Sequence, residues 1–229
     1  MILVPSRGTE SWRGLLADPE KHWKRGYSAL ELAERWENPG GFPPEVASLL
    51  NQHERTRGAT MLLGIPEHRV PLAGGARASQ TDLWVLARTH TGLLSIAVEG
   101  KVNESFGPTV GEWQPASSPG RTKRWAAICS LLEVDQHCNQ ATRYQLFHRT
   151  ASALIEARRF FARSAAVIVH SFGSAAASFG DFQQFVRLLD GDVDRPGQLV
   201  AVPPREDIAL FFGWATGPKP VDEPQTAVS

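Results

Sequence analysis

The stretch TDLWVLARTHTGLLSIAVEGKV, residues Thr81–Val102, contains two runs rich in apolar, β-branched and aromatic side chains on either side of a short polar turn. If the turn is centred between His90 and Thr91, residues whose numbers sum to 181 face each other across an antiparallel hairpin. A slip by one residue would set the apolar side of one strand against the mixed side of the other, so the hydrophobic pattern fixes this register. The apolar pairs that then share one side of the sheet are Leu83–Val98, Val85–Ile96 and Ala87–Leu94.

On the other side of the hairpin, the same register places Asp82 opposite Glu99, with Lys101 two residues along on that face. Two carboxylates at cross-strand distance repel each other, so one tends to stay protonated unless a cation lies between them. Mg²⁺ prefers oxygen ligands and typically takes one or two protein carboxylates, with water and substrate phosphate in its other positions. Such an ion can polarise a phosphodiester and activate water, while Lys101 can orient that water or stabilise the developing oxyanion. The hairpin therefore predicts metal-assisted phosphodiester hydrolysis.

These charged residues also have a purely structural interpretation. Asp82 would begin its strand at a solvated end, and Glu99 and Lys101 would form a surface ion pair that contributes at most about 1 kcal/mol to stability. A D…ExK pattern also arises by chance in many proteins. A functional site is supported because the D…ExK pattern lies on two strands whose apolar pairs all agree on one register.

The composition indicates one soluble domain with no overall charge. Hydrophobic residues make up 42% of the 229, enough for one large core, and we predict a single domain over 1–216. Residues 217–229, GPKPVDEPQTAVS, lack the apolar side chains needed to pack and are predicted to be disordered. Lys and Arg total 24, as do Asp and Glu, so no global field would draw the protein onto nucleic acid or an anionic membrane. Any polyanion site must be local, and Arg121, Lys123 and Arg124 could contact phosphates, although such charge runs are usually solvated.

The cellular location is predicted from the apolar runs, the first residues and the cysteines. The longest apolar runs, such as AAVIV at Ala165–Val169, fall well short of the roughly 20 residues of a membrane helix. The start, MILVPSRG, has no basic segment and too short an apolar core for a signal peptide. Two cysteines make no disulfide framework in a chain of this length and fit a reducing compartment. We therefore expect a cytoplasmic protein with no membrane partner.

Helix and strand signals alternate along the rest of the chain. Ser28 and Glu31 form a capping-box pattern, in which each side chain would accept a hydrogen bond from the other residue's backbone N–H. The alternation predicts an α/β fold with a mixed central β-sheet flanked by helices. Besides the hairpin, helices are predicted over 28–36, 45–56, 119–132, 143–161 and 179–190, and strands over 59–65, 165–172, 198–203 and 208–215.

The hairpin motif is similar to that of a known family. Asp82, followed by a strand, a turn and a second strand that ends in Glu99-Gly100-Lys101, resembles the PD-(D/E)XK nuclease superfamily, which includes restriction endonucleases, recombination exonucleases and repair nucleases. Thr81 stands where the superfamily's name has proline, a departure that many members share. The stretches EGKVNESFGP and RYQLFHRTASALIEA also look similar to uncharacterised bacterial proteins of nuclease-like type.

The resemblance extends to the order of the elements. From residue 28 to residue 172 we predict a helix, a three-stranded meander, a helix and a further strand, an order similar to that of the superfamily. The resemblance implies a restriction-endonuclease-like architecture. It also implies that Asp82 and Glu99 bind Mg²⁺ or Mn²⁺, with the Gly100 carbonyl as a further ligand.

The long predicted helix over 143–161 adds one residue to this site. Gln145, Arg149, Ser152 and Glu156 form a polar stripe along it, and a solvated face is the default expectation for such a stripe. Some members of the superfamily carry a glutamine near the metal on the helix that follows the ExK strand. The resemblance therefore adds Gln145 to the site.

The leading functional hypothesis is a Mg²⁺-dependent endonuclease or exonuclease, a hydrolase that acts on DNA in defence or repair. Asp82, Glu99, Lys101 and Gln145 would form its catalytic site. The alternative is a module that keeps this fold without turnover and binds nucleic acid or a protein partner. The presence of all three residues of the motif, Asp82, Glu99 and Lys101, favours the enzyme. The zero net charge of the chain favours the module or an enzyme that works with a partner. A homodimer also remains open.

Overall fold

Strands β2 (Ser79–Thr89) and β3 (Gly92–Lys101) form the predicted antiparallel hairpin. In the computed structural model, which describes residues 6–37, 40–114, 118–137, 140–173 and 176–220, Leu83 faces Val98 and Val85 faces Ile96. Thr89 pairs with Gly92, so the loop holds two residues, and the glycine adopts a φ of 127° that residues with a side chain rarely adopt. The predicted register is confirmed.

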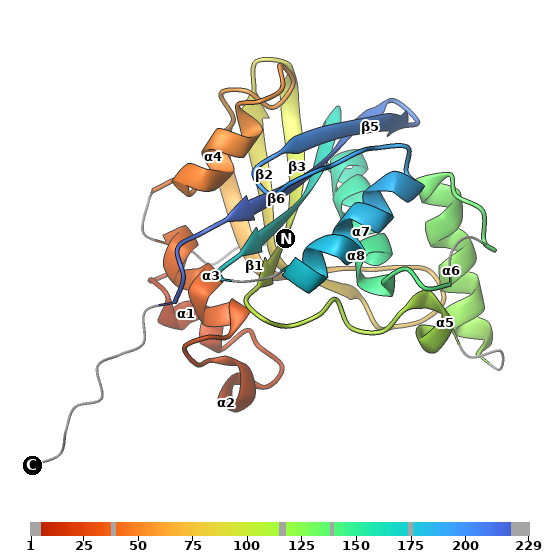
Figure 1. Ribbon diagram of the computed structural model, residues 1–229, viewed down its shortest axis with the longest axis horizontal. Helices are drawn as coiled ribbons and strands as arrows, with labels where there is room; N and C mark the ends of the chain where they lie inside the picture. The colour runs from red at the N-terminus through yellow and green to blue at the C-terminus, as the bar shows by residue number, and fades with distance from the viewer. Residues whose placement is uncertain (1–5, 38–39, 115–117, 138–139, 174–175, 221–229) are drawn as a thin grey trace, which may run out of the picture.

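The hairpin belongs to a six-stranded mixed sheet with the strand order β1-β2-β3-β4-β6-β5 (Figure 1). β3 pairs in parallel with β4, and β4 pairs in parallel with β6. The two outer strands, β1 and β5, pair in antiparallel fashion with β2 and β6. The predicted α/β class with a mixed central sheet is therefore correct. The bounds of the other strands are Thr60–Val70 for β1, Ser164–Ser171 for β4, Leu199–Arg205 for β5 and Ile208–Thr216 for β6.

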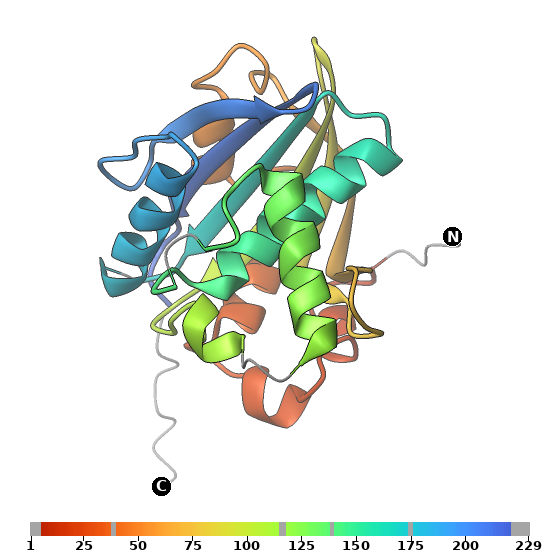
Figure 2. The same ribbon diagram turned by 90° about the vertical axis from the view of Figure 1, so that its right-hand side faces the viewer.

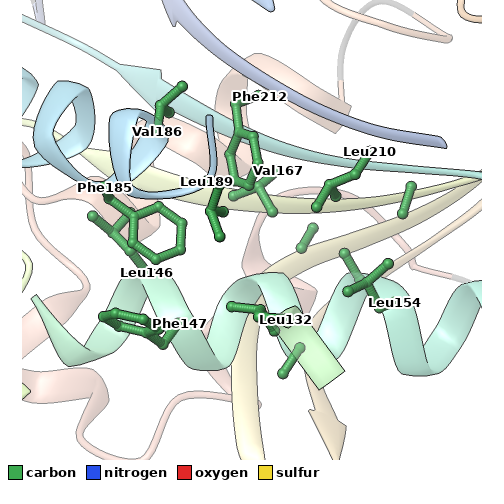
Figure 3. Close-up of a cluster of buried hydrophobic side chains, with 14 of the residues drawn as sticks. Leu132, Leu146, Phe147, Leu154, Val167, Phe185, Val186, Leu189, Leu210 and Phe212 are labelled. Carbon is green, nitrogen blue, oxygen red and sulfur yellow. The ribbon is translucent and has the colours of Figure 1, made fainter. Parts of the chain in front are cut away.

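Helices cover both faces of the sheet (Figures 1 and 2). Side chains alternate along β3, so that Ile96 points towards the N-terminal helices and Ala97 towards the C-terminal helices. Figure 3 shows the core on the C-terminal side, where Phe185 packs against both Phe147 and Phe212. The N-terminal layer holds α1 (Glu10–Arg13), α2 (Pro19–His22), α3 (Ser28–Glu37) and α4 (Pro44–Leu50), and the other layer holds α5 (Val110–Trp113), α6 (Pro119–Leu132), α7 (Tyr144–Arg159) and α8 (Ala176–Leu188).

Two helix predictions require correction. The helix predicted over 45–56 ends at Leu50, because Thr56 donates its hydroxyl hydrogen bond to the Leu50 carbonyl and holds the following residues in turns. The predicted helix start at Ser28 is correct, but its capping box is wrong. Ser28 already lies within α3, and Glu31 accepts from the Gly26 N–H at 3.0 Å instead. The four-residue helices α1, α2 and α5 are too short to show a periodic sequence signal.

The polar stripe of α7 is buried, so the expectation of a solvated face is wrong. Figure 2 shows α7 between the sheet and α6, and it packs on β3 and β4. Arg149, Ser152 and Glu156 are each at most 5% exposed. Ser152 donates to the His148 carbonyl one turn earlier. The helix therefore presents a polar face to the sheet and an apolar face to the rest of the C-terminal layer.

A buried polar contact fixes α3 and α4 against the sheet. Trp36 on α3 donates to His170 Nδ1 at 3.0 Å, and His170 Nε2 lies 2.8 Å from Glu45 Oε1 on α4. Because Nδ1 accepts, the proton of the neutral ring is on Nε2 and is donated to Glu45. Burial lowers the pKa of His170, which keeps the ring neutral at physiological pH.

The chain remains in contact with the domain just beyond β6. The Gly217 N–H donates to the Ser171 carbonyl at 2.8 Å. The rest of the predicted C-terminal tail includes residues 221–229, which lie outside the described residues. Among the described helices, none is both long and apolar enough to cross a membrane.

Candidate active site

The four residues predicted for the site lie together at the end of the hairpin, beside the start of α7. Lys101 Nζ donates to Glu99 Oε1 at 2.7 Å and to Gln145 Oε1 at 3.4 Å. Gln145 Nε2 donates to the same Glu99 oxygen at 2.5 Å. The Gly100 N–H donates to Asp82 Oδ2 at 2.9 Å, which holds that carboxylate beside the end of β3. The structure brings these residues to one place, and their catalytic roles remain predictions.

Glu99 and Lys101 are buried, so they are not the surface pair of the structural interpretation. Each is only 3% exposed. The Lys101 ammonium also lies 4.8 Å from the centroid of the Phe106 ring, a cation–π contact on its apolar side. Charged side chains are almost never buried this deeply unless they are paired, and these two are paired with each other.

Gly100 allows α3 to approach the hairpin closely. A Cβ atom at this position would lie 3.1 Å from the Ser28 Cβ atom and 3.6 Å from Asp82 Oδ2. A larger residue would therefore push the start of α3 away and crowd the Asp82 carboxylate. The glycine between Glu99 and Lys101 is explained by this packing.

Arg149 is the main site residue that the sequence interpretation missed. Its Nε donates to Glu99 Oε2 at 2.5 Å, and its Nη2 lies 3.3 Å from Asp82 Oδ1. A third donor, Nη1, reaches Ser79 Oγ at 3.4 Å. The guanidinium therefore contacts both carboxylates and neutralises the repulsion for which the sequence predicted a metal ion. The available signal was that Arg149 lies one helical turn after Gln145 and shares its face.

Glu67 on β1 is the second residue that was missed. It accepts from Gln80 Nε2 at 2.5 Å and lines the same cleft as Asp82 and Glu99. Its φ of 52° is left-handed, a conformation that strains a residue with a side chain and recurs at functional sites. Burial is the main cause that raises the pKa of Glu67. The predicted strand ended at residue 65, and no sequence pattern indicated this position.

The two central carboxylates have opposite pKa shifts. Burial alone would raise the pKa of Glu99, but the charges of Arg149 and Lys101 outweigh it and lower the pKa to about 2. Burial and then the Glu99 charge raise the pKa of Asp82 to about 8, and Arg149 offsets only part of this rise. The two acids thus differ in ionisation at neutral pH, with Glu99 charged and Asp82 largely protonated.

We expect Asp82 to make the metal-free protein less stable as the pH rises from 5 to 8. The folded state keeps a proton on Asp82 up to pH 8, whereas the unfolded chain loses it near 3.8, so stability is lost between these values. The slope from one proton is at most about 1.4 kcal/mol per pH unit. Denaturant unfolding in EDTA at several pH values would measure it, with Asp82→Asn as the comparison. Equal slopes for the two proteins would contradict the assignment.

A cleft of about 690 Å³ leads to these carboxylates. Residues from the N-terminal helices and their connections form one wall, including Trp12, Trp23 and Tyr27, and we call this space the aromatic cleft. Asp82, with 24% of its side chain exposed, is more accessible in it than Glu99. Asp82 is therefore within reach of a ligand, and Glu99 and Lys101 line the same cleft beside it.

The donor set suits a hard divalent cation. The carboxylate oxygens of Asp82 and Glu99, and the Gly100 carbonyl oxygen, are the kind of ligand that Mg²⁺ prefers. Within the part of the chain that the structure describes, no three Asp, Glu, His or Cys side chains are grouped closely enough to hold an ion as they stand. Because Arg149 contacts both carboxylates, an ion would have to displace its guanidinium, and water or substrate would have to complete the coordination shell.

The fold and the site define an α/β protein whose β-hairpin carries two acids and a lysine, supplemented by a glutamine and an arginine from one helix. The chain belongs to the family described as a domain of unknown function, DUF6946, which matches residues 5–219. No curated protein and no solved structure matches the chain. The description of the family names no activity, so function has to be inferred from the site.

Proposed function

We propose that this protein is a Mg²⁺- or Mn²⁺-dependent nuclease that hydrolyses phosphodiester bonds in DNA. The observation that carries the proposal is the convergence of Asp82, Glu99 and Lys101 from two neighbouring strands at the floor of a cleft. An antiparallel meander followed by a parallel β4, with α7 packed on both, further supports a restriction-endonuclease-like architecture.

Each residue then has a definable task. Asp82, Glu99 and the Gly100 carbonyl would hold the ion, which when bound would polarise the phosphodiester and lower the pKa of a nearby water molecule. Lys101 keeps an ammonium proton for the attacking water or the developing oxyanion, since Glu99 and Gln145 account for only two of its three donors. Gln145 is a positioning residue, because its amide bonds both Glu99 and Lys101.

A nuclease assay tests the proposal directly. Plasmid and single-stranded DNA would be incubated with Mg²⁺, Mn²⁺ or EDTA at pH 8.5, above the pKa of about 8 for Asp82. We expect cleavage with either metal and none in EDTA. The rate of cleavage at a given metal concentration should also fall below pH 8. An ion must displace the proton of Asp82 before that carboxylate can be a ligand. Cleavage that continues in EDTA would contradict a metal-dependent mechanism.

We expect Asp82→Asn to remove most of the rise in melting temperature that Mg²⁺ produces. An ion that binds only the folded state stabilises it by mass action, and a neutral amide is a poor ligand for Mg²⁺. The measurement is thermal unfolding with and without the ion. Asp192→Asn is the matched control, because Asp192 is exposed and pairs with Arg187. An unchanged response in Asp82→Asn would place the ion elsewhere.

One observation favours the second candidate, a module that binds nucleic acid or a protein partner without turnover. Arg149 already contacts both Asp82 and Glu99, so the folded site is charge-compensated without an ion. In this alternative the ions would leave the melting temperature unchanged, and no DNA substrate would be cut. The same experiments therefore separate the two functions.

A further inference from the structure

A second cleft, of about 770 Å³, opens on the other side of the hairpin end. Lys101 and Gln80 line both clefts, so the candidate active site lies where the two meet. Among the described residues that line this second space there is no Asp or Glu. We call it the basic cleft, because its lining includes Arg69, Arg77, Lys101, Arg124 and Arg149.

Three of these cations form no ion pair with an acid among the described residues, although the charge of Arg69 acts on Glu67. Arg124 donates to the backbone carbonyls of Ala73 at 3.0 Å and Arg77 at 2.5 Å, contacts that hold its guanidinium without neutralising it. Among the described residues, Arg69 and Arg77 form no ion pair with any acid. In a chain with no net charge, this is the local concentration of positive charge that a polyanion site needs.

The wall of the basic cleft is tightly packed. The loop that carries Arg77 crosses the start of α6 so closely that a Cβ atom on Gly74 would lie 2.1 Å from the Gly120 carbonyl oxygen. Further along the wall, Trp113 and Tyr144 stack with ring centroids 3.6 Å apart and an interplanar angle of 8°. The backbone of the loop before Arg77 and the guanidinium of Arg124 are thus held in place, which reduces the ordering cost when a ligand binds.

The aromatic cleft on the other side has a different character. Its lining includes the rings of Trp12, His22, Trp23 and Tyr27. Tyr27 is 44% exposed, so part of its ring is available to a ligand. Aromatic side chains of this kind accept the faces of nucleic-acid bases, whereas arginines hold the phosphates.

We propose that the two clefts together bind one single-stranded polynucleotide. Its phosphates would lie along Arg69, Arg77 and Arg124, and a base would stack in the aromatic cleft, so that one phosphodiester crosses the site between Asp82 and Lys101. Volumes of 690 and 770 Å³ are those of small-molecule sites, which are too small to enclose a duplex. The position of the scissile bond rests on the proposed nuclease function, but the binding does not.

The test is fluorescence anisotropy in EDTA with a labelled 12-nucleotide oligothymidine and a 12-base-pair duplex. We expect the single strand to bind at least tenfold more tightly than the duplex. The double variant Arg69→Ala/Arg77→Ala should lose about tenfold or more in affinity for it and should show a shallower salt dependence, by about 0.7 in logarithmic slope for each phosphate contact removed. The matched control, Arg187→Ala/Arg195→Ala, removes the same charge from exposed positions outside both clefts.

Tyr27→Ala probes the aromatic cleft separately. Loss of one base-stacking ring should reduce the affinity for oligothymidine by about tenfold and leave the salt dependence unchanged, because no charge is removed.

Two results would overturn the proposal. One is that the duplex binds as tightly as the single strand or more tightly, and the other is that the Arg69/Arg77 variant and its control lose the same affinity for oligothymidine. The binding assay contains no metal, so its result does not depend on cleavage. Single-strand binding in EDTA, together with no cleavage in the separate assays with Mg²⁺ and Mn²⁺, would refute the nuclease and leave this inference standing. Cleavage of duplex DNA in the presence of metal, without preferential binding of the single strand in EDTA, would refute this inference and leave the nuclease standing.

Discussion

Replacing Lys101 with methionine is expected to reduce the rate of DNA cleavage by about 10²–10³ while leaving most of the metal-dependent stabilisation in place. A cation is not a metal ligand, so the carboxylates that would hold the ion are unchanged. Glu99 also keeps two hydrogen-bond donors in this variant, Arg149 and Gln145. The loss should therefore fall on the chemical step, through the missing ammonium donor beside the scissile phosphate.

The measurement is a comparison of single-turnover cleavage rates at saturating Mg²⁺, together with melting temperatures with and without the ion. Lys219→Met is the matched control, because Lys219 is exposed near the end of the described chain. If Lys101→Met cleaves as fast as the unmodified protein, the role assigned to the lysine is wrong. If neither protein cleaves any substrate with any metal and both bind DNA equally, the non-catalytic module becomes the better description.

Replacing Arg149 with methionine is expected to destabilise the metal-free protein by about 3–5 kcal/mol, because it removes one partner of a buried ion pair and leaves Glu99 with Lys101 in place of two cations. Arg149 is 5% exposed and contacts both Asp82 and Glu99. In the variant, Mg²⁺ should recover more stability than it adds to the unmodified protein, because the ion no longer competes with a guanidinium. Denaturant unfolding in EDTA and in Mg²⁺ measures both effects.

Arg158→Met is the control for this experiment. Arg158 lies on the same helix and forms an ion pair with Glu206, but both side chains are exposed, at 41% and 65%. Exposed pairs contribute at most about 1 kcal/mol, so this variant should remain close to the unmodified protein in both conditions. Equal losses at the two positions would show that the Arg149 contacts do not support the site.

The residues of the hairpin could be predicted because their positions follow from local rules. A strand has a period of two and the loop has two residues, so the apolar pairs fixed which side chains face each other. Asp82, Glu99 and Lys101 then fell on one side without any knowledge of the rest of the chain. Gln145 entered through a family resemblance, and the structure brings it within hydrogen-bond distance of Glu99.

Arg149 and Glu67 could not be predicted in the same way, because their roles depend on tertiary structure. A polar stripe on a helix reads as solvated unless the element that covers it is known, and α7 is buried between the sheet and α6 (Figure 2). Glu67 reaches the cleft from a left-handed position in β1, and the residue there is a glutamate in place of the glycine or asparagine that would signal such a position. The local sequence around Arg149 and Glu67 does not indicate which residues they contact in the folded protein.

Helix α7 carries two kinds of residue within one turn of each other. Phe147 is completely buried in the core that Figure 3 shows, and its neighbours Gln145 and Arg149 bond Glu99. A close-packed interior transmits strain, so a substitution behind the helix that shifts it slightly would move both donors together. Random substitutions in this part of the core should therefore impair the site before they unfold the protein, and sequence drift in the family would be limited at positions that never contact a ligand.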